Sequence, residues 1–70
     1  MKHFFSNDRL SNRVFIVVTD DNDEVAYEDF LYATGSMIDE AKERLFALAR
    51  DWAKANNINL GVRIGRNSND

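Results

Sequence analysis

The chain has 70 residues, a net charge of −3 and no cysteine. Seventy residues suffice for one small domain with a thin core, and the lack of cysteine excludes disulfide bonds and thiolate metal sites. The acidic balance argues against direct binding to nucleic acid, which requires a basic surface.

Residues 1–11 carry Phe4, Phe5 and Leu10 among polar side chains. This pattern is compatible with a short strand, a helical turn or a flap over the core. We therefore expect one domain, 1–70, with an N-terminal arm (1–11), a core (12–66) and a frayed tail (67–70). The arm contains no apolar run like that of a secretory signal, and the longest apolar stretch of the chain, residues 14–18, is too short to span a membrane. We therefore expect a cytoplasmic protein that does not bind membranes.

Residues 13–19 are almost all β-branched or aromatic, which predicts a strand. Its two faces are both apolar, as in a central strand: Val14, Ile16 and Val18 on one, Phe15 and Val17 on the other.

An acidic turn follows at residues 20–23, and residues 24–33 then predict the return strand of a hairpin. Val25, Tyr27 and Leu31 share one face of that strand, and Phe30 and Tyr32 share the other. The apolar phase changes near Glu28 and Asp29, which indicates a β-bulge there.

Residues 37–55 predict one amphipathic helix that begins after Ser36, a good N-cap, and ends at Asn56 and Asn57. Apolar residues recur at spacings of three and four and predict one buried stripe, flanked by Ala49 and Ala53. The stripe consists of Ile38, Ala41, Leu45, Leu48, Trp52 and Ala55.

Residues 58–64 alternate apolar and polar side chains and predict a third strand with one exposed face. The predicted fold class is therefore α+β, with element order ββαβ. We expect a three-stranded antiparallel sheet in the order 2-1-3, with strand 13–19 in the centre and one long helix packed on one face.

Six of the twelve acidic residues lie within residues 20–29. Such a run either keeps a hairpin tip soluble or forms an acidic docking patch that mimics nucleic-acid phosphates. A calcium loop is disfavoured, because Val25 and Leu31 stand where that motif needs glycine and glutamate. The six residues are Asp20, Asp21, Asp23, Glu24, Glu28 and Asp29.

The remaining residues give no sign of an enzyme. His3, the single histidine, lies in the uncertain N-terminal arm, and no nucleophile or phosphate-binding motif accompanies it. We therefore predict no catalytic residue, no metal and no cofactor. Trp52 belongs to the helix stripe, whereas Tyr27, Phe30 and Tyr32 are more ambiguous. Those of them on a sheet face that the helix does not cover would bind another protein or a second copy.

Four arginines bracket the predicted core: Arg9, Arg13, Arg63 and Arg66. They are either scattered solubilising charges or a basic patch opposite the acidic turn. In the second case, each guanidinium offers two hydrogen bonds to a partner's carboxylate.

The chain resembles the family of small coliphage inhibitors of bacterial RNA polymerase, which bind the jaw of the β′ subunit. The residues that carry the resemblance are Phe15, Tyr32-Ala33, Asp39-Glu40-Ala41 and Val62-Arg63-Ile64-Gly65-Arg66. The family's arginines are two residues apart, whereas Arg63 and Arg66 are three apart, so only one of them can match in a regular strand.

The resemblance, together with a compositional similarity to small phage antagonists such as anti-CRISPR proteins, implies a non-enzymatic inhibitor. We expect it to bind a host protein or nucleoprotein complex, namely RNA polymerase or a CRISPR effector. The predicted contacts are the six acidic residues with Arg63 and Arg66. The alternative is a structural or regulatory module that dimerises, as antitoxins do.

Overall fold

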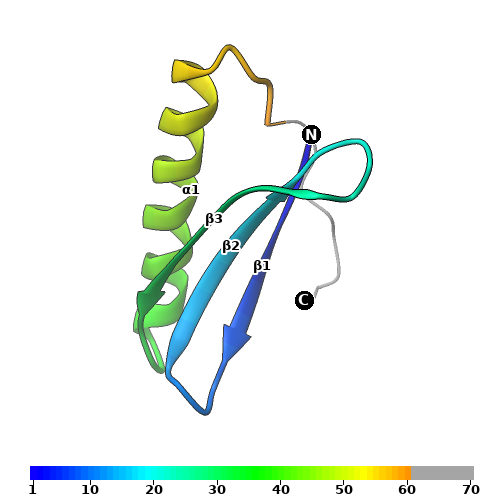
Figure 1. Cartoon of the computed structure of the whole chain (residues 1–70). Helices are drawn as coiled ribbons and strands as arrows, with labels where there is room; N and C mark the ends of the chain where they lie inside the picture. The colour runs from blue at the N-terminus through cyan, green and yellow to red at the C-terminus, as the bar shows by residue number, and fades with distance from the viewer. Residues whose placement is uncertain (61–70) are drawn as a thin grey trace.

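The computed structural model describes residues 1–60, which form three antiparallel strands and one helix. The strands are β1 (Lys2–Asp8), β2 (Arg13–Thr19) and β3 (Val25–Tyr32), and the helix is α1 (Met37–Ala55). Figure 1 shows α1 lying along one face of the sheet. The α+β class, the antiparallel sheet, the central position of β2 and the bounds of β2 and α1 are confirmed.

The strand order is β1-β2-β3, so the predicted order, with residues 58–64 beside residues 13–19, is wrong. The N-terminal arm takes that place, with Lys2 opposite Thr19 and Asp8 opposite Arg13. A hairpin closes a short loop at a small entropic cost, which favours a neighbour in sequence over a distant one. Asn12 helps the return by adopting a left-handed φ of 57°.

Of the third predicted strand, residues 58–64, the structure describes only the first three residues. Residues 58–60 have no regular secondary structure. The rest of that strand, with Arg63, Arg66 and the tail 67–70, lies outside the described residues.

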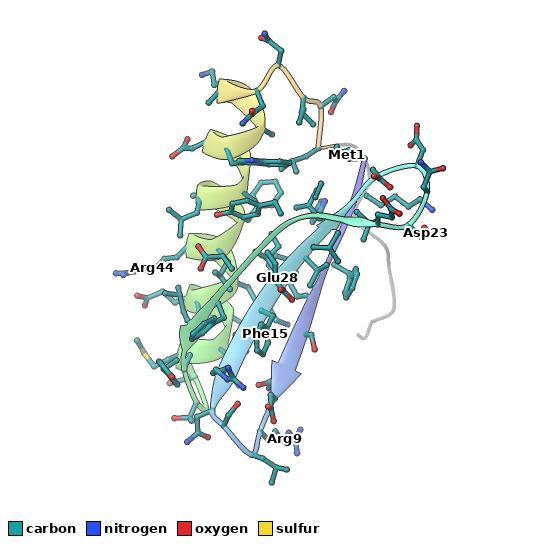
Figure 2. The ribbon with its side chains drawn as sticks, viewed as in Figure 1. Met1, Arg9, Phe15, Asp23, Glu28 and Arg44 are labelled. Carbon is teal, nitrogen blue, oxygen red and sulfur yellow. The ribbon has the colours of Figure 1, made fainter. Side chains whose placement is uncertain are left out.

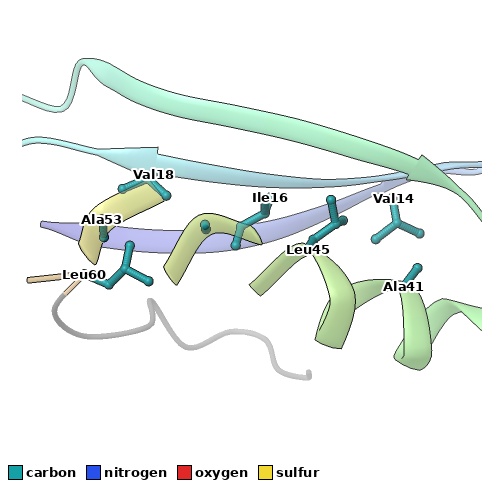
Figure 3. Close-up of a cluster of buried hydrophobic side chains, with 8 residues drawn as sticks. Val14, Ile16, Val18, Ala41, Leu45, Ala53 and Leu60 are labelled. Atoms are coloured by element: carbon teal, nitrogen blue, oxygen red, sulfur yellow. The ribbon is translucent and has the colours of Figure 1, made fainter. Parts of the chain in front are cut away.

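The core lies between β2 and α1 (Figure 3). Val14, Ile16 and Val18 are fully buried on the helix side of β2, and Leu45 of α1 is equally buried against them. Leu60 closes the same cluster beyond the end of the helix. Because side chains of a strand point alternately to its two faces, these three branched side chains of β2 all point towards α1, as the sequence predicts.

The buried stripe of α1 differs from the predicted one. Its buried residues are Ala41, Leu45, Ala49 and Ala53, whereas Leu48 is 44% exposed and Ala55 is exposed. Small side chains let the helix axis approach the sheet closely, so the line of contact follows the alanines. Trp52 lies at the edge of this contact, where its ring stacks on Tyr27 at a centroid distance of 4.9 Å.

The start of α1 does not use the predicted side-chain cap. Ser36 has helical backbone angles and makes no capping hydrogen bond with its side chain. The backbone N–H groups of Met37 and Ile38 instead donate to the carbonyls of Thr34 and Gly35. Gly35 makes this tight turn with a φ of 56°, which costs a glycine little.

The end of α1 follows the prediction. Asn57 adopts the left-handed conformation with a φ of 57°. Its N–H donates to the carbonyl of Lys54, and the N–H of Ile58 donates to the carbonyl of Ala53 at 2.8 Å. These two bonds form a Schellman motif, which satisfies carbonyls that the helix leaves unpaired.

The β-bulge lies at the start of β3 and not near Glu28 and Asp29, where it was predicted. Val18 pairs with Tyr27 and Thr19 pairs with Val25, so that Ala26 is the extra residue. From Tyr27 onward the strand alternates regularly. Tyr27, Asp29 and Leu31 therefore face α1, and Glu28, Phe30 and Tyr32 face the opposite side.

Candidate binding surfaces

The acidic turn between β2 and β3 is held together by hydrogen bonds to its first residue, Asp20. One carboxylate oxygen of Asp20 accepts hydrogen bonds from the backbone N–H groups of Asn22 (2.8 Å) and Glu24 (3.0 Å). Asp23 closes the turn with a φ of 63° and donates its N–H to the carbonyl of Asp20. Asp21, Asp23 and Glu24 are exposed. We name the four residues Asp20, Asp21, Asp23 and Glu24 the acidic tip.

Among residues 1–60, one cation forms an ion pair with the acidic tip. The ammonium of Lys2 is 3.7 Å from a carboxylate oxygen of Asp23, and both side chains are largely exposed. An exposed pair of this kind contributes little to stability because water screens it. The acidic tip thus keeps most of its negative charge available to a partner.

We expect Asp20→Ala to lower the free energy of unfolding by about 1 kcal/mol, because two backbone donors lose their shared acceptor. The matched control is Asp21→Ala, for which we expect a change below about 0.5 kcal/mol, since Asp21 is exposed. Urea denaturation followed by circular dichroism measures both. Equal losses would show that Asp20 does not organise the turn.

Glu28 and Asp29 do not extend the acidic tip as one patch, although the sequence places them in the same run. They point to opposite faces of the sheet. The carboxylate of Asp29 accepts a hydrogen bond from the N–H of Phe30 (2.8 Å) and one from the hydroxyl of Tyr27 (3.3 Å). Burial and the neighbouring Asp29 charge raise the pKa of Tyr27, so its hydroxyl stays protonated and remains a donor. The carboxylate of Asp29 is therefore occupied by hydrogen bonds within the domain, whereas Glu28 is exposed.

A cluster of aromatic rings around one arginine lies on the sheet face that α1 does not cover. We name Arg13, Phe15, Phe30 and Tyr32 the aromatic–arginine cluster. The ring centroids of Phe15 and Phe30 are 5.6 Å apart, and those of Phe30 and Tyr32 are 5.5 Å apart. The Arg13 guanidinium lies over both phenylalanine rings, at 5.1 Å from Phe15 and 5.3 Å from Phe30. Tyr32 is 73% exposed and Phe30 is 38% exposed.

The β1–β2 hairpin holds Arg13 in this position. The Nε–H of Arg13 donates to the hydroxyl of Ser11 (2.8 Å), and that hydroxyl donates to Asp8 (2.8 Å). An Nη atom of Arg13 is also 3.8 Å from the Asp8 carboxylate. The bond from Ser11, backbone donors and the Arg13 charge together hold the pKa of Asp8 below its usual value. The contacts with Ser11 and Asp8 thus fix the orientation of the Arg13 guanidinium.

Charge is distributed unevenly along the strands. Figure 2 shows Arg9 and Asp23 at opposite ends of the sheet, with Phe15 and Glu28 between them. Arg9 and Arg13 therefore lie at the end opposite the acidic tip, which is compatible with the second of the two alternatives given for the four arginines. The other two, Arg63 and Arg66, lie outside the described residues.

His3 is not in a loose end. It is 5% exposed in β1, where its ring lies 5.3 Å from Phe46 and 6.2 Å from Phe5 between centroids. Pairing of β1 with β2 directs it under α1, a contact that the local sequence does not reveal. His3 therefore packs in the interior as an aromatic ring.

The candidate sites among the described residues are two open surfaces, the acidic tip and the aromatic–arginine cluster. Within residues 1–60, no group of three or more histidine, aspartate or glutamate side chains is arranged to hold a metal ion. The same part of the chain has no helix that is long and apolar enough to cross a membrane. Comparison with protein-family models, with curated proteins and with solved structures gave no match.

Proposed function

We propose that this protein is a small non-enzymatic antagonist, of the type that phages produce, which binds and inhibits a nucleic-acid-processing machine of a bacterial host. RNA polymerase and CRISPR effectors are the two candidate targets. The observation that carries the proposal is the acidic tip: three exposed carboxylates on a turn that Asp20 holds in one conformation.

Basic grooves that bind nucleic-acid phosphates are the surfaces that such a tip fits. The tip offers several negative charges within a few residues and would accelerate association with a basic surface at low ionic strength. Inhibition then requires only that the domain occupy the groove. Glu28 is exposed on the sheet face and can add to the contact, whereas Asp29 is committed to Tyr27 and Phe30.

The test replaces the three outward carboxylates by their amides: Asp21→Asn, Asp23→Asn and Glu24→Gln in one variant. Asp20 is kept because it forms the turn, and asparagine at position 23 tolerates the positive φ. The matched control removes three exposed acids from α1: Asp39→Asn, Glu43→Gln and Asp51→Asn. These three form no ion pair within residues 1–60.

Two assays measure the outcome: transcription by purified bacterial RNA polymerase and target cleavage by purified CRISPR effectors. We expect the wild-type domain and the α1 control to inhibit one of the two machines equally. The tip variant should inhibit about tenfold more weakly, with the difference shrinking at high salt. Inhibition of neither machine by the wild-type domain would reject the antagonist proposal. Equal inhibition by the tip variant would reject the acidic tip as the contact.

A further inference from the structure

On the sheet face opposite α1, Arg13 and Glu28 carry opposite charges at equal distances on the two sides of an aromatic centre. Phe15 and Phe30 are direct cross-strand partners. Arg13 lies two residues from Phe15 along β2, towards one end of the sheet. Glu28 lies two residues from Phe30 along β3, towards the other end, where it pairs with Val17. Each charge is therefore about 7 Å from the Phe15–Phe30 pair along the strands, on opposite sides of it.

We propose that two copies of this chain pair through this face, with the Arg13 of each copy bound to the Glu28 of the other. The twofold axis runs between the two sheets, perpendicular to the strands, at the level of the Phe15–Phe30 pair. Rotation about that axis places the phenylalanines of both copies together in the centre. It also brings each Arg13 to the level of the other copy's Glu28, one strand to the side.

The charges select this orientation over its alternative. If the axis ran parallel to the strands, each residue would keep its position along the strand direction. The two copies of Arg13 would then lie close to each other, and so would the two copies of Glu28. Like charges opposite one another are destabilising. Sheets that pack face to face lie about 10 Å apart, a gap that an arginine and a glutamate side chain can span together.

Arg13 is prepared for such a contact. Its Nε and one Nη atom bond Ser11 and approach Asp8, and the other Nη atom has no hydrogen bond or ion pair within residues 1–60. The side chain is 35% exposed. Glu28 is exposed on the same face, and its carboxylate makes no hydrogen bond or ion pair within those residues.

The size of the face predicts a weak dimer. Three strands about 4.8 Å apart and about seven residues long offer roughly 350 Å² of flat area. A stable interface buries about 800 Å² on each partner, so we expect a weak dimer with a dissociation constant between about 10 µM and about 1 mM. The acidic tip lies beyond the paired region and stays exposed at both ends of the dimer, so this inference does not depend on the proposed function. The two proposals share only Glu28, which pairing would withdraw from the host contact.

Sedimentation equilibrium of the full chain, from about 10 µM to about 1 mM, measures the association. We expect a reversible monomer–dimer equilibrium. A monomer over the whole range would overturn the proposal.

A charge-swap pair tests the contact itself. In Arg13→Glu alone, two carboxylates meet at each contact of the dimer, and in Glu28→Lys alone, two cations meet. We expect each variant to dimerise at least tenfold more weakly than the wild type. In a mixture of the two variants, the introduced carboxylate at position 13 faces the introduced ammonium at position 28, and the second contact is the original one. The mixture should therefore recover the dimer, and failure to recover it would overturn the Arg13–Glu28 contact.

A second measurement on the wild-type chain keeps the test valid if Arg13→Glu does not fold. In a mixture of isotope-labelled and unlabelled protein, intermolecular nuclear Overhauser effects should link the rings of Phe15 and Phe30 in the two copies. Intermolecular contacts from α1 instead of this face would overturn the proposal.

Discussion

Replacing Leu45 by alanine is expected to lower the free energy of unfolding by about 2–5 kcal/mol. Leu45 is fully buried between α1 and β2, against Val14 and Ile16 (Figure 3). A domain of 70 residues has only about 4–10 kcal/mol of stability in total, so the variant loses a large share of it. Urea denaturation followed by far-ultraviolet circular dichroism measures the change.

Leu48→Ala is the matched control, because it makes the same substitution one turn further along the same helix. Leu48 is 44% exposed, so we expect a loss below about 1 kcal/mol. The stripe predicted from the sequence puts both leucines in the core and therefore predicts similar losses. Similar losses would mean that α1 is rotated relative to the orientation described here.

The comparison of the two leucines shows where sequence patterns stop being sufficient for the helix. The bounds of α1 follow from local signals: apolar periodicity, and asparagine in the left-handed conformation at the end. The rotation of α1 about its own axis does not follow from local signals, because large apolar residues dominate a hydrophobicity pattern. Contact with a sheet instead favours the small residues Ala41, Ala49 and Ala53, which allow close approach.

The strand β1 illustrates a second limit. Lys2–Asp8 mixes polar and aromatic residues, and its extended conformation depends on pairing with β2. Residues 58–64 have the more regular alternation and are therefore the better strand by pattern alone. Chain connectivity nevertheless favours β1 as the neighbour of β2, because the short loop before Arg13 brings the two strands together.

The candidate surfaces were predictable to different degrees. The acidic tip follows from composition, since aspartate and asparagine both favour turns and carry the charge outward. The separation of Glu28 from Asp29 depends on the position of the bulge at Ala26, which the apolar pattern misplaced. The role of Arg13 depends on the register that puts Phe30 opposite Phe15. The spacings Arg13-x-Phe15 and Phe30-x-Tyr32 were a usable signal, because each places two side chains on one face of a strand.

Replacing Ala49 by leucine is expected to destabilise the domain by about 1–3 kcal/mol, although the substitution adds apolar surface. Ala49 is fully buried where α1 meets the sheet, so a larger side chain must push the helix away from β2. Thermal denaturation followed by circular dichroism should show a clear fall in Tm.

Ala47→Leu is the matched control, since Ala47 is exposed two residues earlier on the same helix and a leucine there meets no neighbour across the interface. We expect a change below about 0.5 kcal/mol. A stabilised Ala49→Leu variant would mean that space exists between α1 and the sheet. The alanines would then not set the distance between the two layers, and the physical reason given for the rotation of α1 would be wrong.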